Sequence, residues 1–528
     1  MALFLGIDLG TSSVKVLLLT EGGQVLGHGS GGYPINTPHP GWAEQDPQTW
    51  WDASVKAVRQ AIIGIAGRES IAAIGISGQM HGTVLLDQQG RILHPAVIWP
   101  DQRTTKQVAE ITQLIGAEQL INVTGSSIAT GFQAATIRWF QQEERDIWRR
   151  VHQVLLPKDY LRWRMTGEFA TDASDGSGTL LLDGQKRCWS PQILKKLDIE
   201  ANLLPPIQSS QALVGGLIPA AADDFGLPSG IPVITGAADT ASSLLGAGVT
   251  NPKNLLMTIG TGGQLVLPAF NFIVDEGGQM HTFCSALEPL PHQPGWYLMS
   301  ATLSAGQSLR WLRDNVFSLD GEDAYDQMTA WAGETPLGAN GLIFLPYLVG
   351  ERIPLMDPHA RGAFLGLTLS HGQAELVRAV MEGVIFSLYE AYLVLLEAGV
   401  QPERIIISGG GARSRLWQQM VADVFGLPVM RLQVNEQSAL GAALLAGAGG
   451  GHLEMIQASR HWASYDHPFE PNYSDQAHYL ELLEIFQLTY LKFKEEFLRL
   501  NAAERWGADS QIIAGIMDKK TGSPPNSH

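Results

Sequence analysis

Short apolar runs alternate with longer amphipathic segments along this chain, a pattern that predicts an α/β protein. Apolar residues at 2–5 and 14–19 flank the small polar turn Gly10-Thr11-Ser12-Ser13, as in a β-hairpin. The run Ile71–Ser77 is almost wholly apolar, which is typical of a strand buried on both faces of a sheet. We expect long helices at 47–62, 375–398 and 475–500, where apolar residues recur at helical spacing.

The turn of the first hairpin has the composition of an anion site. Its backbone N–H groups and hydroxyls can face a phosphate, and Gly10 lets that phosphate approach the backbone closely. Asp8 precedes the turn, where a carboxylate among phosphates makes sense as a partner of Mg²⁺. From these residues alone, an ordinary hairpin with an exposed Asp8 is an equally good interpretation.

A second stretch repeats this pattern at half the length of the chain. In Leu255–Val266, two apolar runs flank the turn Gly260-Thr261-Gly262. A repeat at this spacing predicts two domains of similar build, each offering a phosphate-binding hairpin to a shared cleft. We place the first domain at 1–246 and the second at 247–500, followed by an extension at 501–528 whose end we expect to be disordered.

Polar residues follow two of the predicted strands, where open α/β sheets place their ligands. They are Gln79, Met80 and His81 after the first strand, and Trp99, Asp101 and Arg103 after the second. This set suits a small hydroxylated molecule, because charged groups can bind hydroxyls and an aromatic ring can cover a C–H face. Taken singly, His81 could be a loop histidine and Asp101–Arg103 a surface ion pair.

Asp239 follows another predicted strand and opens a helix at Thr240-Ala241-Ser242. A carboxylate in this position is a helix N-cap by default. It also lies where a catalytic base would stand, with small neighbours that leave room for a substrate. Lys158, Asp159 and Asp172 could line the same pocket, but we interpret them as helix ends and turn residues, with Asp172 in a polar loop over 171–178.

Three glycines, Gly409–Gly411, occupy a strand-to-helix turn that continues into Ala412 and Ser414. They allow close backbone approach to adenosine or its phosphates, with a plain tight turn as the alternative. The segment is neither a GxGxxG fingerprint nor a Walker A loop, which disfavours a Rossmann dehydrogenase and a P-loop enzyme.

The composition of the chain limits the classes of partner that we expect it to bind. The 528 residues carry a net charge of −17, which argues against nucleic acid and anionic membranes but leaves room for a phosphorylated ligand held by amides and Mg²⁺. The two cysteines form no disulfide framework or zinc motif. The N-terminus lacks the pattern of a signal peptide, so we expect a cytoplasmic protein.

Taken together, these motifs resemble the FGGY carbohydrate kinases. The resemblance is carried, in order, by GIDLGTSSVKV, ISGQMHG, WPDQR, LPKDY, GAADTAS, IGTGG, LPYLVGERIP and SGGGARSRLWQQMVADV. It implies the actin/Hsp70/sugar-kinase fold: two RNase H-like domains with ATP in the cleft between them. It also implies a sugar and MgATP as small-molecule partners, and it leaves a homodimer open.

The resemblance further implies a role for each candidate residue. Asp239 becomes the catalytic base and, with Asp8, a metal-binding residue. The residues expected to bind the sugar are Gln79, Met80, His81, Trp99, Asp101, Arg103 and Thr240. The residues expected to bind the nucleotide are Gly10, Thr11, Ser12, Lys15, Gly260, Thr261, Gly262, Gly410, Gly411, Ala412 and Ser414.

GQMHG, LPKDYLR and TGEFATDASDGSGT are most similar to the branch of the family that phosphorylates D-xylulose to D-xylulose 5-phosphate. Three residues, Pro100, Gln133 and Thr136, depart from that branch and bear on the exact ketose. The alternatives are a kinase for ribulose, gluconate, glycerol or a deoxy-ketose and, in another class, an actin-like ATP-binding protein without a sugar.

Overall fold

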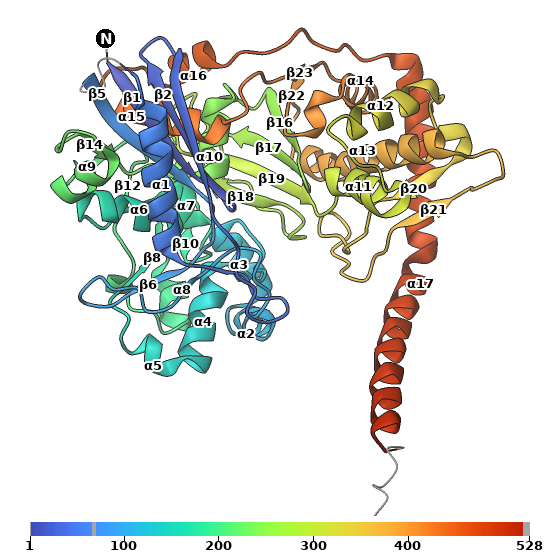
Figure 1. Ribbon diagram of the computed structural model, residues 1–528, viewed down its shortest axis with the longest axis horizontal. Coiled ribbons are helices and arrows are strands. Elements are labelled where there is room, and N and C mark those ends of the chain that lie inside the picture. Colours follow the sequence, from blue (N-terminus) through green and yellow to red (C-terminus); the bar gives the residue numbers. More distant parts are fainter. Residues whose placement is uncertain (1, 66–69, 521–528) are drawn as a thin grey trace, which may run out of the picture.

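The computed structural model describes residues 2–65 and 70–520, which form two halves that each contain a large mixed sheet (Figure 1). The first sheet has the order β13-β14-β5-β1-β2-β3, and β15 pairs with the end of β5. Its strands are β1 (Leu3–Leu9), β2 (Ser13–Thr20), β3 (Val25–Gly32), β5 (Ile71–Gly78), β13 (Leu213–Gly216), β14 (Pro232–Ile234) and β15 (Ala237–Ala238). The predicted α/β fold is confirmed.

The second sheet has the order β18-β19-β17-β16-β22-β23. Its strands are β16 (Asn254–Ile259), β17 (Gly263–Ala269), β18 (His281–Cys284), β19 (Trp296–Thr302), β22 (Arg404–Ser408) and β23 (Val429–Arg431). In both sheets a first strand pairs antiparallel with the next strand of a hairpin and parallel with a later strand: β1 with β2 and β5, β16 with β17 and β22. The two hairpins recognised in the sequence are therefore equivalent elements.

The remaining elements surround these sheets. In the first half they are β4 (Glu44–Gln45), α1 (Pro47–Ile62), β6 (Val84–Leu86), β7 (Ala96–Val97), α2 (Thr105–Ile115), α3 (Ala117–Thr124), α4 (Gln133–Glu143), α5 (Arg145–Trp148), β8 (Gln153–Leu155), α6 (Pro157–Thr166), β9 (Thr171–Asp172), α7 (Ala173–Ser177), β10 (Leu182–Asp183), β11 (Cys188–Trp189), α8 (Pro191–Lys196), β12 (Ile207–Gln208), α9 (Pro219–Phe225) and α10 (Asp239–Gly246). In the second half they are α11 (Gly306–Trp311), α12 (Ala324–Glu334), β20 (Ile343–Leu345), β21 (Ala363–Leu365), α13 (Gln373–Glu397), α14 (Arg415–Phe425), α15 (Gln437–Gly449), α16 (Met455–Trp462) and α17 (Tyr473–Lys520).

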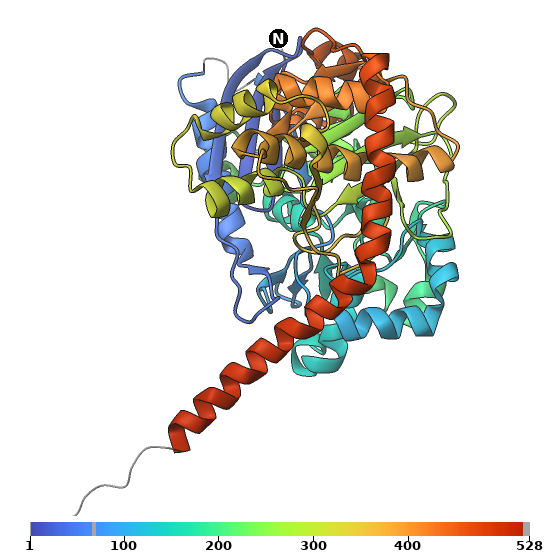
Figure 2. The same cartoon turned by 90° about the vertical axis from the view of Figure 1, so that its right-hand side faces the viewer.

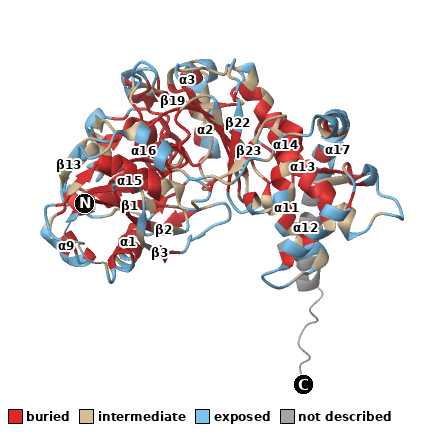
Figure 3. Ribbon diagram, turned by 90° about the horizontal axis from the view of Figure 1, so that it is seen from above, coloured by how far each residue is buried: buried red, intermediate tan, exposed pale blue. Residues whose placement is uncertain are grey.

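Helix α15 comes late in the chain but packs on β1 and β5 of the first sheet, and it also packs along α10. Both strands carry a glycine at the contact, because a Cβ on Gly6 or Gly75 would collide with a carbonyl oxygen of α15. Figure 3 shows α15 and α13 among the most buried helices of the molecule. The two halves are thus joined by a helix of the second half that covers the sheet of the first.

Helix α13 lies against β19 and β17 in the second half. Among the described residues it alone is long and apolar enough to cross a membrane, and 83% of its apolar window is buried inside the protein. Helix α13 is therefore a core helix, and its apolar side chains pack against other parts of the protein.

Two local predictions are corrected. The polar segment 171–178, predicted as a loop, is instead strand β9 and helix α7, and it is buried. It folds because Asp172 caps α7 by accepting hydrogen bonds from the backbone of Ser174 and Asp175. Asp239 is not the N-cap of α10: Ala238 occupies that position, and Asp239 is the first helical residue.

The last helix is longer than predicted. Helix α17 continues to Lys520 instead of ending near Leu500, and it leaves the body of the molecule (Figure 2). Its predicted apolar stripe is confirmed at Tyr479, Phe486 and Tyr490, which are buried in the core of the second half. Disorder was expected for 518–528: residues 518–520 instead form the end of α17, and residues 521–528 lie outside the described residues.

Candidate active site

Two carboxylates meet at one edge of the first sheet, although they lie far apart in the sequence. Strand β5 pairs in parallel with both β1 and β15, and in this register Asp8 and Ala237 both lie beside Ser77. Asp239 follows β15 directly, so Asp8 and Asp239 lie on either side of the end of β5. This is the edge at which parallel strands deliver ligand-binding residues.

Both carboxyls are shifted toward their neutral forms. Burial, followed by the charge of Asp239, raises the pKa of Asp8 to about 7. Burial raises the pKa of Asp239 to about 6, although its Oδ1 accepts hydrogen bonds from the backbone and hydroxyl of Thr240 at 2.6 and 3.1 Å. Two desolvated carboxyls at the same sheet edge are an arrangement in which a cation stabilises the charged forms.

A magnesium ion fits this pair. Asp8 Oδ1 is buried without a hydrogen-bond partner, so it is free to coordinate a metal. Within residues 2–65 and 70–501 no group of three or more His, Cys, Asp or Glu side chains could hold a metal ion. One or two carboxylates are nevertheless enough for Mg²⁺, which completes its octahedron with water and substrate phosphates.

The turn of the first hairpin is held by hydrogen bonds from three other segments of the first half. The Tyr33 hydroxyl donates to Gly10 O, and the side chain of Gln45 donates to Thr11 O at 2.7 Å. Trp99 Nε1 donates to Thr11 Oγ1 at 2.9 Å, which joins a predicted sugar residue to a predicted phosphate residue. Lys15 lies directly across the hairpin from Asp8.

The turn of the second hairpin lies against the start of α11. Gly260 O accepts a hydrogen bond from Gly306 N, and Thr261 O accepts from Ala305 N and Gln307 N, at 2.8–3.1 Å. A Cβ on Gly262 would lie 2.7 Å from Thr302 O, which explains the glycine at that position. These bonds fix the turn through its carbonyl oxygens.

His81 is a constrained residue beside this edge. Its φ of 70° is unusual for a residue other than glycine. Burial lowers the pKa of His81 to about 4, so the ring is neutral. Because Nδ1 contacts the carbonyl oxygen of Gly178, Nδ1 carries the proton and Nε2 is left as a hydrogen-bond acceptor. His81 is thus partnered, and it still has one acceptor to offer to a hydroxyl.

The second half completes the surroundings of this histidine, which the sequence did not indicate. The Tyr297 hydroxyl lies 3.8 Å from Met80 Sδ, and the ring of Phe283 lies 6.2 Å from the ring of His81. His281, whose pKa is lowered to about 3 by burial, stacks on Phe283 at 5.5 Å. These residues belong to β18 and β19, whose approach to the first half depends on the tertiary fold.

Asp101 and Arg103 are brought together, but as a buried pair. Arg103 bonds Asp101 and Glu44, and its guanidinium lies 3.6 Å from the ring centroid of Trp42 and 5.0 Å from that of Trp139. Asp101 Oδ2 also accepts from the backbone N–H of Ala43 at 2.7 Å. The pair is therefore not a surface ion pair. Arg103 Nη1 is nevertheless buried without a hydrogen-bond partner, and a role of the pair in sugar binding stays a prediction.

Two glutamines support the loop that carries Met80 and His81. Gln79 donates to Gln45 Oε1 at 3.0 Å, and its own Oε1 is buried without a partner. Gln133, one of the unusual residues of this chain, donates to Gly82 O at 3.0 Å and to Leu155 O at 3.3 Å. Gln133 thus ties the end of the loop at Gly82 to strand β8.

A cavity of about 430 Å³ joins Lys15 to the glycine turn of the second half. It is lined by Lys15, Ser408, Gly409, Gly410, Ala412, Arg413, Arg431, Leu432, Gln433, Val434, Asn435, Glu436 and Gln437. A Cβ on Gly410 would meet nothing within 4 Å, whereas one on Gly411 would collide with Ile259. Ser414 instead caps α14 by accepting from Trp417 N at 3.2 Å. The cavity suits a nucleotide that extends toward the first hairpin.

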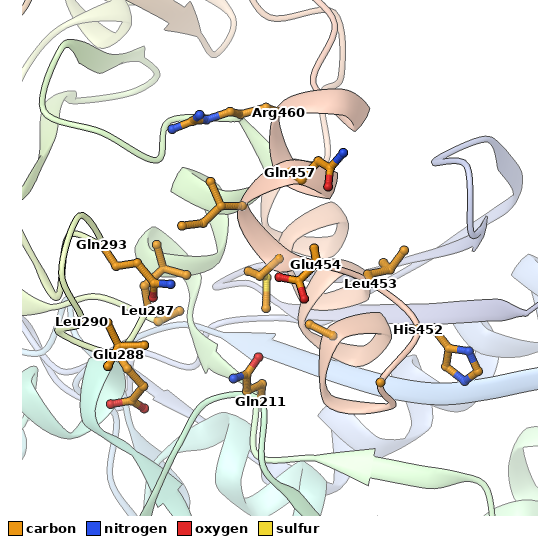
Figure 4. A pocket seen from close by; sticks show the side chains of 15 residues that line it. Gln211, Leu287, Glu288, Leu290, Gln293, His452, Leu453, Glu454, Gln457 and Arg460 are labelled. Carbon is orange, nitrogen blue, oxygen red and sulfur yellow. The ribbon is translucent and has the colours of Figure 1, made fainter.

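A larger groove, about 790 Å³, lies elsewhere between the loop 286–293 and helix α16 (Figure 4). Polar side chains, among them Glu288, Glu454 and Arg460, line it. None of the candidate site residues lines this groove, so the volume of a cavity does not by itself identify the active site.

Comparison with known proteins agrees with this geometry. The N-terminal domain of the FGGY family of carbohydrate kinases matches residues 3–246, and the C-terminal domain matches 255–449. The chain is 39% identical to a xylulose kinase of Escherichia coli (84% of this chain, 89% of that protein) and 30% identical to a gluconokinase of Bacillus subtilis (91% and 94%). A crystal structure titled as a xyloylose kinase from Brucella ovis superposes with a TM-score of 0.86 at 32% identity, covering 93% of this chain and 99% of that one. With both domains matched in order over most of its length, this enzyme belongs to the FGGY family of carbohydrate kinases.

Proposed function

We propose that this protein transfers the γ-phosphoryl group of ATP to the terminal hydroxyl of D-xylulose, giving D-xylulose 5-phosphate and ADP. The observation that carries the proposal is that Asp8 and Asp239 lie at one edge of the first sheet, where β5 ends and the loop with His81 begins. The name of the E. coli relative, a xylulose kinase, supports the choice of sugar.

Asp239 is the proposed base. A pKa of about 6 leaves its carboxylate ionised at neutral pH and yet able to take a proton from a hydroxyl as that oxygen attacks phosphorus. His81 Nε2 can accept a hydrogen bond from another hydroxyl of the sugar, and Met80 offers apolar surface beside it. Closure of the two domains on the substrates would exclude water, which would otherwise compete as phosphoryl acceptor.

The nucleotide side uses the two hairpin turns and the glycine turn. Gly10, Thr11, Ser12 and Lys15 face the phosphates from the first half, and Gly260–Gly262 face them from the second. Gly410 and Ala412 border the cavity proposed for adenosine, and Gly411 lies between them in the same turn. Asp8 and Asp239 would hold Mg²⁺, which supplies positive charge to offset the phosphates when bound.

Replacing the proposed base tests the mechanism. We expect Asp239→Asn to bind ATP nearly as well as the wild type while turnover falls by about three orders of magnitude or more. Sugar phosphate and ADP should both be measured. Phosphorylation of xylulose at near wild-type rate by this variant would refute the assignment of Asp239.

A panel of sugars in a coupled ADP-release assay tests the substrate. We expect D-xylulose to give the highest kcat/KM among D-xylulose, D-ribulose, gluconate and glycerol. A higher value for one of the other three would identify a sister kinase. ATP turnover without any sugar phosphate would instead favour an actin-like ATPase.

The setting of the reaction is part of the proposal. We place the sugar-binding domain at 1–246 and the nucleotide-binding domain at 247–500, in a cytoplasmic enzyme that binds neither nucleic acid nor membranes. The net charge of −17 supports the latter two points. A homodimer stays a prediction, and sedimentation at micromolar concentration would test it.

A further inference from the structure

The segment that leads into Asp239 is fixed by groups outside its own sheet. Thr235 N donates to Ala212 O and Gly236 N donates to Ser210 O, both at 2.9 Å. The guanidinium of Arg162 donates to Thr235 O at 2.9 Å. The last backbone N–H before the candidate base, that of Ala238, donates to the side chain of Ser174 at 3.0 Å.

Ser174 can accept that bond because its own proton is committed elsewhere. Its hydroxyl donates to Asp172 Oδ2, so a lone pair of the same oxygen remains for Ala238. Ser174 is completely buried, and no water competes for the hydroxyl. The side chain therefore acts as an acceptor of fixed direction.

Asp172 is in turn held in its ionised form. Its Oδ2 also accepts from Ser174 N at 2.9 Å and Ser210 Oγ at 2.8 Å, and Lys158 Nζ lies 3.1 Å from Oδ1. Burial alone would raise the pKa of Asp172, but Lys158 and the two hydroxyls lower it below its usual value. A charged acceptor makes the bond from Ser174 stronger than one between neutral groups.

We propose that Ser174, oriented by Asp172, is a positioning residue for Asp239, acting through the backbone of Ala238. The inference rests on the function proposed above. Among the described residues, the carboxylate of Asp239 accepts hydrogen bonds from Thr240 alone, so its place is set by where the backbone of Asp239 lies. A shift of about 1 Å in a reacting group can cost about a hundredfold in rate.

The same helix also contacts the second half. Ser177, at the other end of α7, accepts a hydrogen bond from Cys284 N on β18 at 3.1 Å. Helix α7 thus lies between the backbone of the candidate base and the sheet edge that carries Phe283 and His281. This placement explains why a polar, glycine-containing segment is buried in the middle of the molecule.

Ser174→Ala tests the proposal, with Ser210→Ala as its matched control. Both variants remove one hydroxyl that donates to Asp172 Oδ2, but only Ser174 also accepts from Ala238. We expect similar decreases in Tm for the two variants. We expect kcat with D-xylulose to fall about 10- to 100-fold in Ser174→Ala and less than about threefold in Ser210→Ala, with KM for ATP unchanged in both.

Two further variants keep the test sharp. Ser174→Thr retains the hydroxyl and should recover most of kcat. Ser174→Cys fills the space but accepts hydrogen bonds weakly, so it should lose kcat even if Ser174→Ala does not fold. Equal loss of kcat in the Ser174 and Ser210 variants, or full activity of both Ser174→Ala and Ser174→Cys, would overturn the proposal.

The outcome is separable from that of the proposed function. If the wild type phosphorylates another sugar best, the same comparison is made with that sugar. If Asp239→Asn remains active, the base assignment fails irrespective of Ser174. If Asp239→Asn is inactive and Ser174→Ala keeps full kcat at a normal Tm, the positioning role alone fails.

Discussion

Trp99 Nε1 donates a 2.9 Å hydrogen bond to Thr11 Oγ1, which links the strand end predicted to bind the sugar with the turn predicted to bind phosphate. Trp99 is 44% exposed, so this bond lies at an open part of the site and not in the core. A ligand that reaches Thr11 will therefore meet the edge of Trp99.

Trp99→Phe should keep the ring and lose this bond. We expect kcat/KM for the sugar to fall about three- to tenfold, since one neutral hydrogen bond at a partly exposed position is worth about 1 kcal/mol. Tm should change little. Trp189→Phe is the control, because Trp189 Nε1 donates a comparable 2.8 Å bond to Pro205 O. Equal effects of the two substitutions on kcat/KM would contradict a specific role for Trp99.

The pH dependence of activity should report the proposed base. Burial raises the pKa of Asp239 to about 6, and the carboxylate must be ionised to accept a proton. We expect kcat/KM to fall about tenfold for each pH unit below about 6. Steady-state rates between about pH 5 and pH 8, measured after checking that the enzyme survives incubation at each pH, give the profile. A profile that stays flat down to about pH 5 would argue against Asp239 as the base.

Asp8→Asn should stabilise the unliganded protein above about pH 7 while removing its Mg²⁺-dependent activity. The pKa of Asp8 is raised by burial and by Asp239, so the folded protein holds a proton that the unfolded chain has released. Stability from this group is complete below about pH 4 and is lost as the pH rises to about 7. The neutral amide escapes that loss.

We expect Asp8→Asn to gain about 1 to 2 kcal/mol in free energy of unfolding at pH 8, and little at pH 4, because partial exposure weakens the effect. Urea unfolding at both pH values measures it. Asp52→Asn, on the exposed face of α1, is the matched control and should change little. A loss of stability in Asp8→Asn at pH 8 would show that the carboxylate is favourably solvated or paired in the folded state.

Arg103→Lys distinguishes a structural from a substrate-binding role. Lysine cannot bond Asp101 and Glu44 as arginine does while lying flat on Trp42, so we expect a loss of about 2 to 4 kcal/mol in stability. The KM for sugar should stay within about twofold of the wild type. Arg91→Lys, in an ion pair whose arginine is 70% exposed, should cost less than about 1 kcal/mol. A raised KM without loss of stability would instead place Arg103 at the sugar.

The pattern of apolar residues along the sequence was sufficient to locate the main strands and helices. It located the two equivalent hairpins, the helix that Asp46 caps at Pro47, and the apolar stripe of the last helix. These features depend on neighbouring residues, whose spacing reports which face is buried and where a turn can form. The same local logic failed at 171–178, because polar residues that pair with one another can be buried as a cluster.

The sequence by itself therefore determined the α/β build, the repeated glycine turns and the residue types from which a kinase site could be made. Only the tertiary structure decided that Asp8 and Asp239 lie at the same sheet edge, that Arg103 lies against two tryptophans, and that Ser174 bonds the backbone before the candidate base. The physical reason is that strand register and helix packing arise from long-range burial, which no local pattern encodes. A residue's type limits its chemistry, and its neighbours in space decide which part of that chemistry it can use.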